Sequence, residues 1–378
     1  MSVPTSANRS QVAQEQGSAA ITLTGITSGR RTSRNRSGNS SRQANTPASD
    51  APRHVGSVRS AVIIVNDLAP GARSARWRPL FQQVLGRGVE LSEVHVAHFE
   101  GAAAAARGAA AWKTDLVIAV GGDGTVNACV NGIGDAPTRL AVVPAGTAND
   151  LARLACQAVN PAHSTGDSWR RRDIDAISID GGPRFYSAGG MGWVADVAHT
   201  ANRWRAGGAI RRKLFARIGS AIYTLACVAV IAFSRRLGGR FHVSYVDAAD
   251  GRDKSLDFDG YGMLVANCNR VGKSFHLAPI SQIDDGVFEL IFFPRTSRLR
   301  LLRAVLMAQK DRLFELPEVF WLQVRSAEVI IDRPQRFFGD GEILAERDRF
   351  TLSLASTPVR LLAPRAATVD PEPVREVA

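Results

Sequence analysis

The stretch that decides the fold runs from Asp115 to Thr125 and reads DLVIAVGGDGT. Its continuous apolar run is typical of a strand covered on both faces of a sheet. Three glycines within four residues then allow a tight turn, and a helix is predicted over Thr125–Asn131. Such a unit directs backbone N–H groups and a helix N-terminus at one spot. The sequence therefore predicts an anion site suited to phosphate.

Asp123 lies inside this loop, where its carboxylate would repel a bound phosphate. The conflict disappears if a divalent cation lies between the two, as nucleotide-dependent transfer requires. The alternative is a glycine-rich turn in which Asp123 only caps the following helix. The loop by itself leaves both interpretations open.

A second loop favours the phosphate site. Pro144–Asp150 reads PAGTAND, follows the predicted strand Leu140–Val143 and begins the next helix. Two neighbouring parallel strands would thus end in glycine- and threonine-containing loops at one edge of the sheet. Ligands of open α/β sheets bind along that edge.

Strands alternate with helices around these loops, which predicts a three-layer α/β domain with a parallel, doubly wound sheet. The expected strands are 61–65, 89–99, 115–120 and 140–143, and the expected helices are 73–85, 101–112, 125–131 and 148–155. After about Arg172 the pattern changes to short β-rich runs, among them Ile174–Ile179, 328–331 and 337–338. The first belongs to a hairpin around Gly181-Gly182, and a helical spacing of leucines over Leu299–Leu313 interrupts the later ones. This favours a second, β-sandwich-like domain.

We therefore expect four segments. Residues 1–57 form a disordered basic tail, 58–172 the nucleotide-binding domain with a return of about 355–364, 173–354 the β-rich domain, and 365–378 a disordered tail.

The formal charge is +12, and residues 1–60 hold eight arginines against two acids, which is +6. An anionic partner is expected. No aromatic residue separates the arginines at 30–42 to stack on bases, so specific nucleic-acid binding is not predicted.

Ile218–Phe233 is an uncharged run of 16 residues with arginines on both flanks. A membrane span needs roughly 20 apolar residues, so a packed helix or an interfacial anchor is expected instead.

Four widely spaced cysteines form no metal-binding pattern and are expected to be reduced, buried thiols. We expect a cytoplasmic protein associated peripherally with an anionic membrane, and a homodimer is left open.

With these motifs in order, the sequence resembles the diacylglycerol kinase catalytic-domain family, bacterial lipid kinases related to sphingosine and ceramide kinases. The matching residues are GGDGTVN (Gly121–Asn127), PAGTAND (Pro144–Asp150), Asp284-Asp285-Gly286 and Asp340-Gly341-Glu342, spread over roughly residues 58–364. GGDGT alone also occurs in NAD kinases. The combination with the second loop and the late Asp-Gly-Glu is far more specific.

The resemblance implies Mg-ATP between the two domains and phosphorylation of a diacylglycerol-like lipid hydroxyl. Glu342 would be the base and Asp123 would engage the magnesium and phosphates. The nucleotide-binding residues that it implies are Asn66, Gly121, Gly122, Asp123, Gly124, Thr125, Val126, Asn127, Gly146 and Thr147. It also implies a structural magnesium at Asp285 with main-chain oxygens nearby, for which we assign Gln282, Asp285 and Val287.

Two departures from the family pattern leave alternatives open. The phosphate loop expected after the first strand is irregular over Asn66–Gly71, and Gln282 stands where relatives often have lysine. A NAD kinase and a catalytically silent nucleotide- or lipid-binding module therefore remain as rival interpretations.

Overall fold

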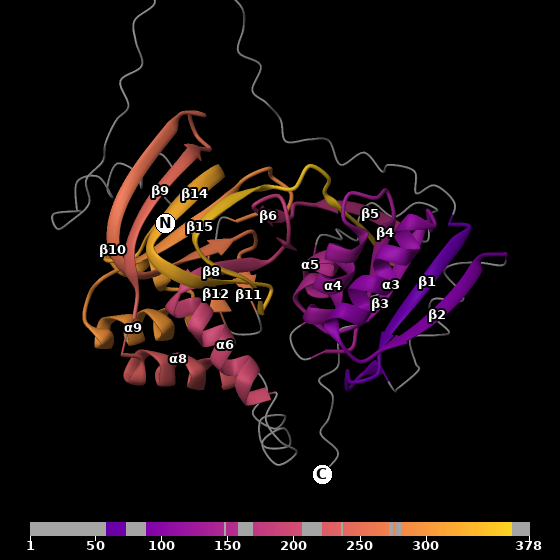
Figure 1. Ribbon diagram of the computed structural model, residues 1–378, viewed down its shortest axis with the longest axis horizontal. Coiled ribbons are helices and arrows are strands. Elements are labelled where there is room, and N and C mark those ends of the chain that lie inside the picture. Colours follow the sequence, from indigo (N-terminus) through magenta and orange to yellow (C-terminus); the bar gives the residue numbers. More distant parts are fainter. Residues whose placement is uncertain are drawn as a thin grey trace, which may run out of the picture.

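The computed structural model describes residues 58–72, 88–146, 149–157, 169–205, 221–235, 237–271, 275–276, 278 and 281–364. The described chain forms two domains that lie side by side (Figure 1). Its helix and strand labels below follow that figure.

A six-stranded sheet forms the first domain, in the order β2-β1-β3-β4-β16-β5. Its strands are β1 (Ser60–Asn66), β2 (Glu90–Val96), β3 (Leu116–Gly121), β4 (Arg139–Pro144), β5 (Trp169–Ile174) and β16 (Val359–Pro364). The first four are parallel, and the residues of β3 are buried throughout. Because β1, β3 and β4 are neighbours and parallel, their carboxyl ends meet at one edge.

Helices α3 (Phe99–Ala111), α4 (Asp123–Ile133) and α5 (Asp150–Gln157) belong to this domain. Alanines of α3 and apolar residues of α4 share one core with the side chains of β1 and β3 on one face of the sheet. A second core lies on the other face and includes Ala69 and Ala72, which follow β1. The helix expected over 73–85 lies outside the described residues.

The second domain is built on antiparallel strands. They are β6 (Ile177–Ile179), β7 (Arg184–Phe185), β8 (Ala188–Gly192), β9 (Gly239–Asp247), β10 (Asp253–Ala266), β13 (Phe288–Pro294), β14 (Phe320–Gly339) and β15 (Glu342–Leu354). The long strands β10 and β14 each pair with β8, β9 and β13, so the sheet folds around a phenylalanine-rich core. A separate two-stranded pair joins β11 (Arg270–Val271) to β12 (Phe275–His276).

Helices α6 (Trp193–Arg205), α8 (Ala221–Phe233) and α9 (Arg298–Gln309) cover the other face of this sheet, and a short 3-10 turn, Leu313–Glu315, follows α9. Figure 1 shows them together along one side of the β-rich domain. Among the described residues, no helix is both long enough and apolar enough to cross a membrane.

The predicted fold class, an α/β domain with a parallel sheet followed by a β-rich sandwich-like domain, is confirmed. Several elements differ in detail from the prediction. The expected strand Ile174–Ile179 is split, because Ile174 ends β5 in the first sheet while Ile177 begins β6 in the second. The separate runs at 328–331 and 337–338 are parts of the single strand β14, which continues through bulges.

Candidate active site

Three loops meet at the carboxyl edge of the parallel sheet. Asn66, at the end of β1, donates from Nδ2 to Thr125 Oγ1 at 2.8 Å, which ties the first loop to α4. The Gly71 N–H donates to the Ala145 carbonyl at 3.1 Å, and the Ala145 N–H donates to the Gly121 carbonyl at 2.9 Å. The irregular Asn66–Gly71 loop is therefore packed against the other two.

The glycine loops after β3 and β4 touch each other through backbone. A Cβ added to Gly146 would lie 2.4 Å from the Cα of Gly122, and one added to Gly122 would lie 3.2 Å from the Cα of Gly146. Gly122 is also the N-cap of α4. A side chain at Gly146 would force the two loops apart, whereas one at Gly122 would require a shift of a few tenths of an ångström.

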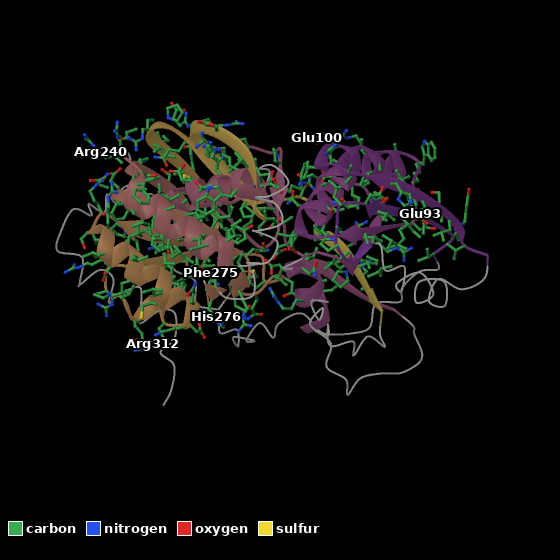
Figure 2. All side chains as sticks on the ribbon, turned by 90° about the horizontal axis from the view of Figure 1, so that it is seen from below. Glu93, Glu100, Arg240, Phe275, His276 and Arg312 are labelled. Carbon is green, nitrogen blue, oxygen red and sulfur yellow. The ribbon has the colours of Figure 1, made fainter. Side chains whose placement is uncertain are left out.

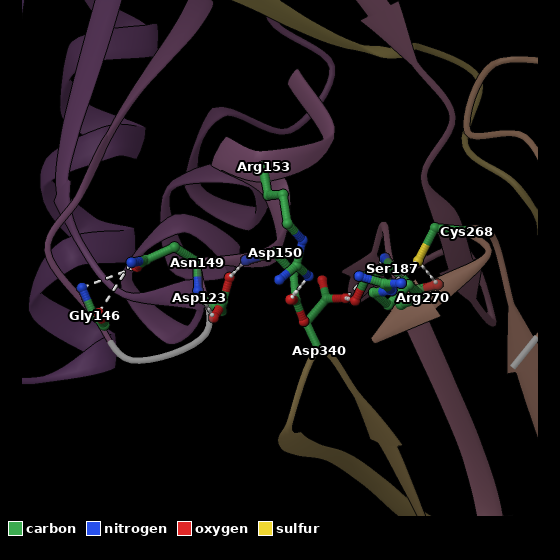
Figure 3. A network of polar contacts seen from close by, with 9 residues as sticks. All are labelled: Asp123, Gly146, Asn149, Asp150, Arg153, Ser187, Cys268, Arg270 and Asp340. Atoms are coloured by element: carbon green, nitrogen blue, oxygen red, sulfur yellow. Dashed lines mark hydrogen bonds and ion pairs between the residues drawn. The ribbon is translucent and has the colours of Figure 1, made fainter. Parts of the chain in front are cut away.

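The Asp123 carboxylate caps a helix that is not its own. It accepts the backbone N–H of Asn149 at 2.9 Å and that of Asp150 at 2.5 Å, at the start of α5 (Figure 3). Burial and, after it, the neighbouring Asp150 carboxylate raise the pKa of the Asp123 carboxyl to about 6, while the Asp150 N–H opposes the shift. Asp123 thus joins the two phosphate-loop candidates to each other.

The Asp-Gly-Glu motif forms the tight turn between β14 and β15. Asp340 and Gly341 both have positive φ, 50° and 88°, as a two-residue hairpin of the primed type requires, and Gly339 pairs with Glu342. Asp340 accepts hydrogen bonds from the backbone N–H groups of Tyr186 (3.0 Å) and Ser187 (2.9 Å) and from Ser187 Oγ (2.6 Å). Burial raises the pKa of the Asp340 carboxyl, and these donors oppose the rise. Asp340 is therefore an anchor for the turn.

A clasp of asparagines joins α4 to the second domain. Asn127 donates from Nδ2 to Asp340 Oδ2 at 2.8 Å and to the Arg184 carbonyl at 3.0 Å. Asn131, one turn further, donates to the same carbonyl at 2.9 Å and accepts the Arg184 N–H at 2.7 Å. The side chains of Val126 and Asn127 are buried, and the assignment of both residues to nucleotide binding stays a prediction.

Glu342 faces α4 across the domain boundary. A Cβ added to Gly124 would lie 3.2 Å from Glu342 Oε1, so the carboxylate lies against the first turn of that helix. The Asp340-Gly341 turn that precedes Glu342 is also held by α6, because Asn202 donates from Nδ2 to the Gly341 carbonyl at 2.8 Å. Two residues far apart in sequence, Asp123 and Glu342, therefore line one cavity.

This cavity has a volume of about 340 Å³ and two unlike ends. Its polar end is formed by Gly122, Asp123, Gly124, Asp150, Ser187, Asp340, Gly341 and Glu342. Its apolar end lies between the sheet and the helices of the second domain and includes Trp193, Val197, Leu264, Phe293, Val305 and Phe338. The aromatic residues between 185 and 193 are divided between two sides of the sheet, since Phe185 belongs to the sandwich core while Trp193 lines the cavity.

The residues at the polar end fit a magnesium-bound nucleotide. The N-terminus of α4, where Gly122 provides no side-chain cap, supplies the partial positive charge that phosphate prefers. Asp123 and Asp150 supply carboxylate oxygens, the ligands that Mg²⁺ prefers. Within the described residues no group of three or more His, Cys, Asp or Glu side chains could hold a metal ion. That suits Mg²⁺, which is commonly held by one or two carboxylates together with substrate phosphates.

The loop predicted to bind a structural magnesium has internal hydrogen bonds of its own. Asp285 Oδ1 accepts the Val287 N–H at 3.2 Å, and the Gly286 N–H donates to Asp175 Oδ2 at 2.8 Å. Burial raises the pKa of Asp285 to about 6, and the Asp175 carboxylate adds to the rise. Gln282 is exposed. The metal site at Gln282, Asp285 and Val287 stays a prediction.

Sequence reasoning missed several residues of the site. Asp150 was within the quoted PAGTAND motif, yet only the structure shows it buried, paired with Arg153 and beside Asp123 (Figure 3). Ser187 and Asn202 belong to no motif and carry no sequence signal of their role. Thr147, predicted to bind the nucleotide, lies outside the described residues.

Each of the two domains matches a known protein-family model. Residues 60–179 match the model of the diacylglycerol kinase catalytic domain, and residues 195–362 match that of the YegS C-terminal NAD kinase beta sandwich-like domain. A diacylglycerol kinase of Bacillus subtilis is 28% identical over 245 residues, which is 63% of this chain and 74% of that protein. A Pseudomonas aeruginosa protein described as "probable lipid kinase YegS-like" is 30% identical over 275 residues, 69% of this chain and 80% of that one.

Solved structures share the fold. A diacylglycerol kinase of Bacillus anthracis superposes with a TM-score of 0.54 at 16% identity, covering 80% of this chain and 96% of that one. A second chain from the same organism gives a TM-score of 0.59 at 19% identity and covers 81% and 97%. At these identities the superpositions speak for the fold alone.

Proposed function

Since the chain belongs to the diacylglycerol kinase catalytic-domain family of lipid kinases, we propose that it transfers the γ-phosphate of ATP to the hydroxyl of a diacylglycerol-like lipid. The observation that carries the proposal is the shape of the cavity. An apolar chamber ends at a cluster of carboxylates beside the N-terminus of α4. A lipid alcohol would place its hydrocarbon chain in the apolar chamber and its hydroxyl group beside the carboxylates.

The residues of the chain have separate tasks in this proposal. Backbone N–H groups at the start of α4 bind phosphate oxygens, and Gly122 and Gly124 keep side chains away from them. Magnesium, when bound, would neutralise charge on the phosphates, with Asp123 among its candidate ligands. Asp340 and Asn202 fix the hairpin turn from two sides, so that Glu342 is held in one orientation.

Glu342 accepts the proton of the lipid hydroxyl as the oxygen forms its bond to phosphorus. An alcohol loses its proton late in such a transfer, so a carboxylate of ordinary basicity suffices when it is well positioned. The proton moves from the hydroxyl oxygen to the Glu342 carboxylate, and the bond from the γ-phosphorus to the bridging oxygen of the nucleotide breaks. The second domain thus supplies the base while the first holds the phosphates.

The size of the cavity bears on the acceptor. A cavity of about 150 Å³ lined by Leu, Ile and Phe admits benzene, with its six carbons. By proportion, the whole cavity of about 340 Å³ corresponds to on the order of fourteen carbons, which is an upper bound because the polar end takes part of this volume. We propose that the acceptor places one acyl or alkyl chain in the cavity, and that any second chain stays outside it.

A NAD kinase is the second candidate, because residues 195–362 match a domain described as NAD kinase beta sandwich-like. The lining of the cavity argues against it. A soluble dinucleotide needs polar partners along its length, whereas most residues of this cavity are apolar.

The test is a phosphorylation assay with the full chain, γ-labelled ATP and Mg²⁺. Diacylglycerol and monoacylglycerol in mixed micelles, a total lipid extract and NAD are offered in parallel. We expect label in a lipid product and none in NADP, and no label without Mg²⁺. Label in NADP alone would support the second candidate. Nucleotide binding without any labelled product would support a silent binding module.

A further inference from the structure

Exposed apolar side chains gather on two neighbouring helices, α8 and α9. Five of the ten large hydrophobic side chains that are exposed among the described residues lie there: Leu225, Val228, Phe233, Leu299 and Leu306. The two helices pack against each other on the outside of the β-rich domain (Figure 1). Together their outward sides form one surface, here called the α8–α9 face.

Helix α8 is apolar on every side. Its thirteen residues, AIYTLACVAVIAF, include no charged one. Leu225 is 46% exposed and lies on the same side as Val228, while Phe233 at the end of the helix is 82% exposed. A helix that is apolar all round is normally buried in protein or in contact with lipid. Its inner side is buried here, so its outer side lacks a partner among the described residues.

Helix α9 alternates apolar and basic residues on its outer side. Leu299 and Leu306 are seven residues apart, and therefore lie on one side of the helix two turns apart, 78% and 49% exposed. Arg303 lies between them on that side, with Arg300 beside it. Both arginines are exposed, and in the described part of the chain their side chains form no ion pair. Neither helix contains an Asp or a Glu.

Arg298 shows that this side of the molecule is rigidly built. Its guanidinium donates to the carbonyls of Ile231 (2.9 Å), Ala232 (2.7 Å) and Ser234 (2.6 Å). It thereby satisfies the C-terminal carbonyls of α8 and fixes α9 to that end. The apolar residues of both helices therefore keep a fixed arrangement relative to each other.

The same two helices form the wall of the cavity. Tyr223 and Cys227 of α8 and Val305 of α9 line it from inside, while Leu225 and Leu306 face outward. Figure 2 views the molecule from below, and in it Phe275, another cavity-lining residue, and Arg312, just beyond α9, lie in the second domain, away from Glu93 and Glu100 of the first. Only one layer of helices separates the α8–α9 face from the apolar chamber.

We propose that the α8–α9 face docks on an anionic lipid bilayer. Leu225, Phe233 and Leu299 would enter the boundary between headgroups and acyl chains, and Arg300 and Arg303 would pair with lipid phosphates. Apolar residues bordered by cations on a helix surface are the pattern of an interfacial helix. A second copy of the chain fits less well, because a symmetric contact would bring the uncompensated arginines of both copies together.

The docking proposal rests on the proposed function in one respect only, namely that the bilayer supplies the lipid that enters the cavity. Docking itself needs no nucleotide. The experiment is therefore co-sedimentation of the full chain with vesicles in the absence of ATP, so that a failure of the kinase proposal does not affect its result. Vesicles of phosphatidylcholine alone are compared with vesicles containing equal amounts of phosphatidylglycerol and phosphatidylcholine.

We expect clear binding to the phosphatidylglycerol vesicles and weaker binding to phosphatidylcholine. The double variant Arg300→Gln/Arg303→Gln should weaken binding to the anionic vesicles roughly thirtyfold, as expected for two cations near such a surface. The double variant Leu299→Gln/Leu306→Gln should weaken binding to both kinds of vesicle. Trp112→Gln is the matched control, since Trp112 is 86% exposed but lies in the first domain.

Two results would overturn the proposal. One is unchanged vesicle binding in both double variants, which would assign membrane contact to another part of the chain, such as the arginine-rich residues 1–57. The other is a dimer in light scattering that Leu299→Gln/Leu306→Gln converts to a monomer, which would make a second copy the partner of this face. Circular dichroism of the variants, which change only exposed side chains, verifies that they are folded.

Discussion

The two ends of the cavity differ in almost every physical respect. The polar end is made of backbone and polar side chains from both domains. Two of its acids, Asp123 and Asp340, each accept two or more hydrogen bonds. The apolar end is made by one domain alone, from side chains that contact one another without hydrogen bonds. The polar end is therefore sensitive to the placement of single atoms, whereas the apolar end is sensitive to volume.

This difference indicates that the polar end would determine the rate of phosphate transfer and the apolar end the choice of lipid. Hydrogen-bonded groups in a confined site are costly to misplace, because a buried donor or acceptor without a partner loses its solvation. Apolar walls tolerate different occupants of similar size. Substitutions at the polar end should thus change the rate of transfer, and those at the apolar end should change which lipids are accepted.

The largest effect is expected for Glu342→Gln. The amide keeps the size of the side chain but cannot accept the hydroxyl proton, so the turnover number should fall by about 10²- to 10⁴-fold. Nucleotide affinity should change little. The measurement is steady-state transfer to diacylglycerol micelles, with Glu346→Gln as control, because Glu346 lies on the same strand, is exposed and pairs with Arg336. Normal turnover in Glu342→Gln would remove the residue from the mechanism.

An intermediate effect is expected for Ala304→Phe at the apolar end. Ala304 is buried on the inner side of α9 and lines the cavity, so a larger side chain would occupy the space of the acceptor chain. We expect a roughly 10- to 200-fold loss of kcat/KM for long-chain acceptors, the range seen when hydrophobic pockets gain or lose small groups. Activity on an acceptor with a four-carbon chain should be retained. Equal losses for short and long chains would contradict a chain-binding role.

The smallest effect is expected for the asparagine clasp that joins α4 to the second domain. Asn127→Ala removes one donor from Asp340 and one from the Arg184 carbonyl, and should lower the free energy of unfolding by about 1–3 kcal/mol. Denaturant unfolding followed by circular dichroism measures it. The control, Arg107→Ala on the exposed side of α3, should stay within about 0.5 kcal/mol of the parent. Parent-like stability of Asn127→Ala would show that the clasp adds nothing to the junction.

Much of the first domain could be predicted from the sequence, because its signals are local. The buried run at 116–120 and the glycines after it specify a strand and a turn within a dozen residues. The second domain was harder. Its strand β14 is a single element of 20 residues that pairs with β13, β9, β15 and β8 in turn, so its sequence shows no constant alternation. The prediction accordingly broke it into short runs.

The roles of the acids could not be predicted at this level. From the sequence, Asp123 could face the phosphates or cap its own helix; in the structure it lines the cavity and also caps α5, through residues 26 and 27 positions later. Asp340 lines the cavity together with Glu342, but its hydrogen bonds to Ser187 and Asn127 join it to residues 153 and 213 positions away. Hydrogen-bond partners at such separations leave no pattern in a single sequence.

The sequence by itself determined the two glycine loops, their common edge and the kind of domain that carries them, because strand periodicity and glycine turns act over a few residues. Only the tertiary structure decided that Glu342 lies against Gly124, that the cavity joins an acidic end to an apolar one, and that α8 and α9 expose apolar side chains outside it. These features depend on which surfaces pack together, and packing is set by the whole chain at once.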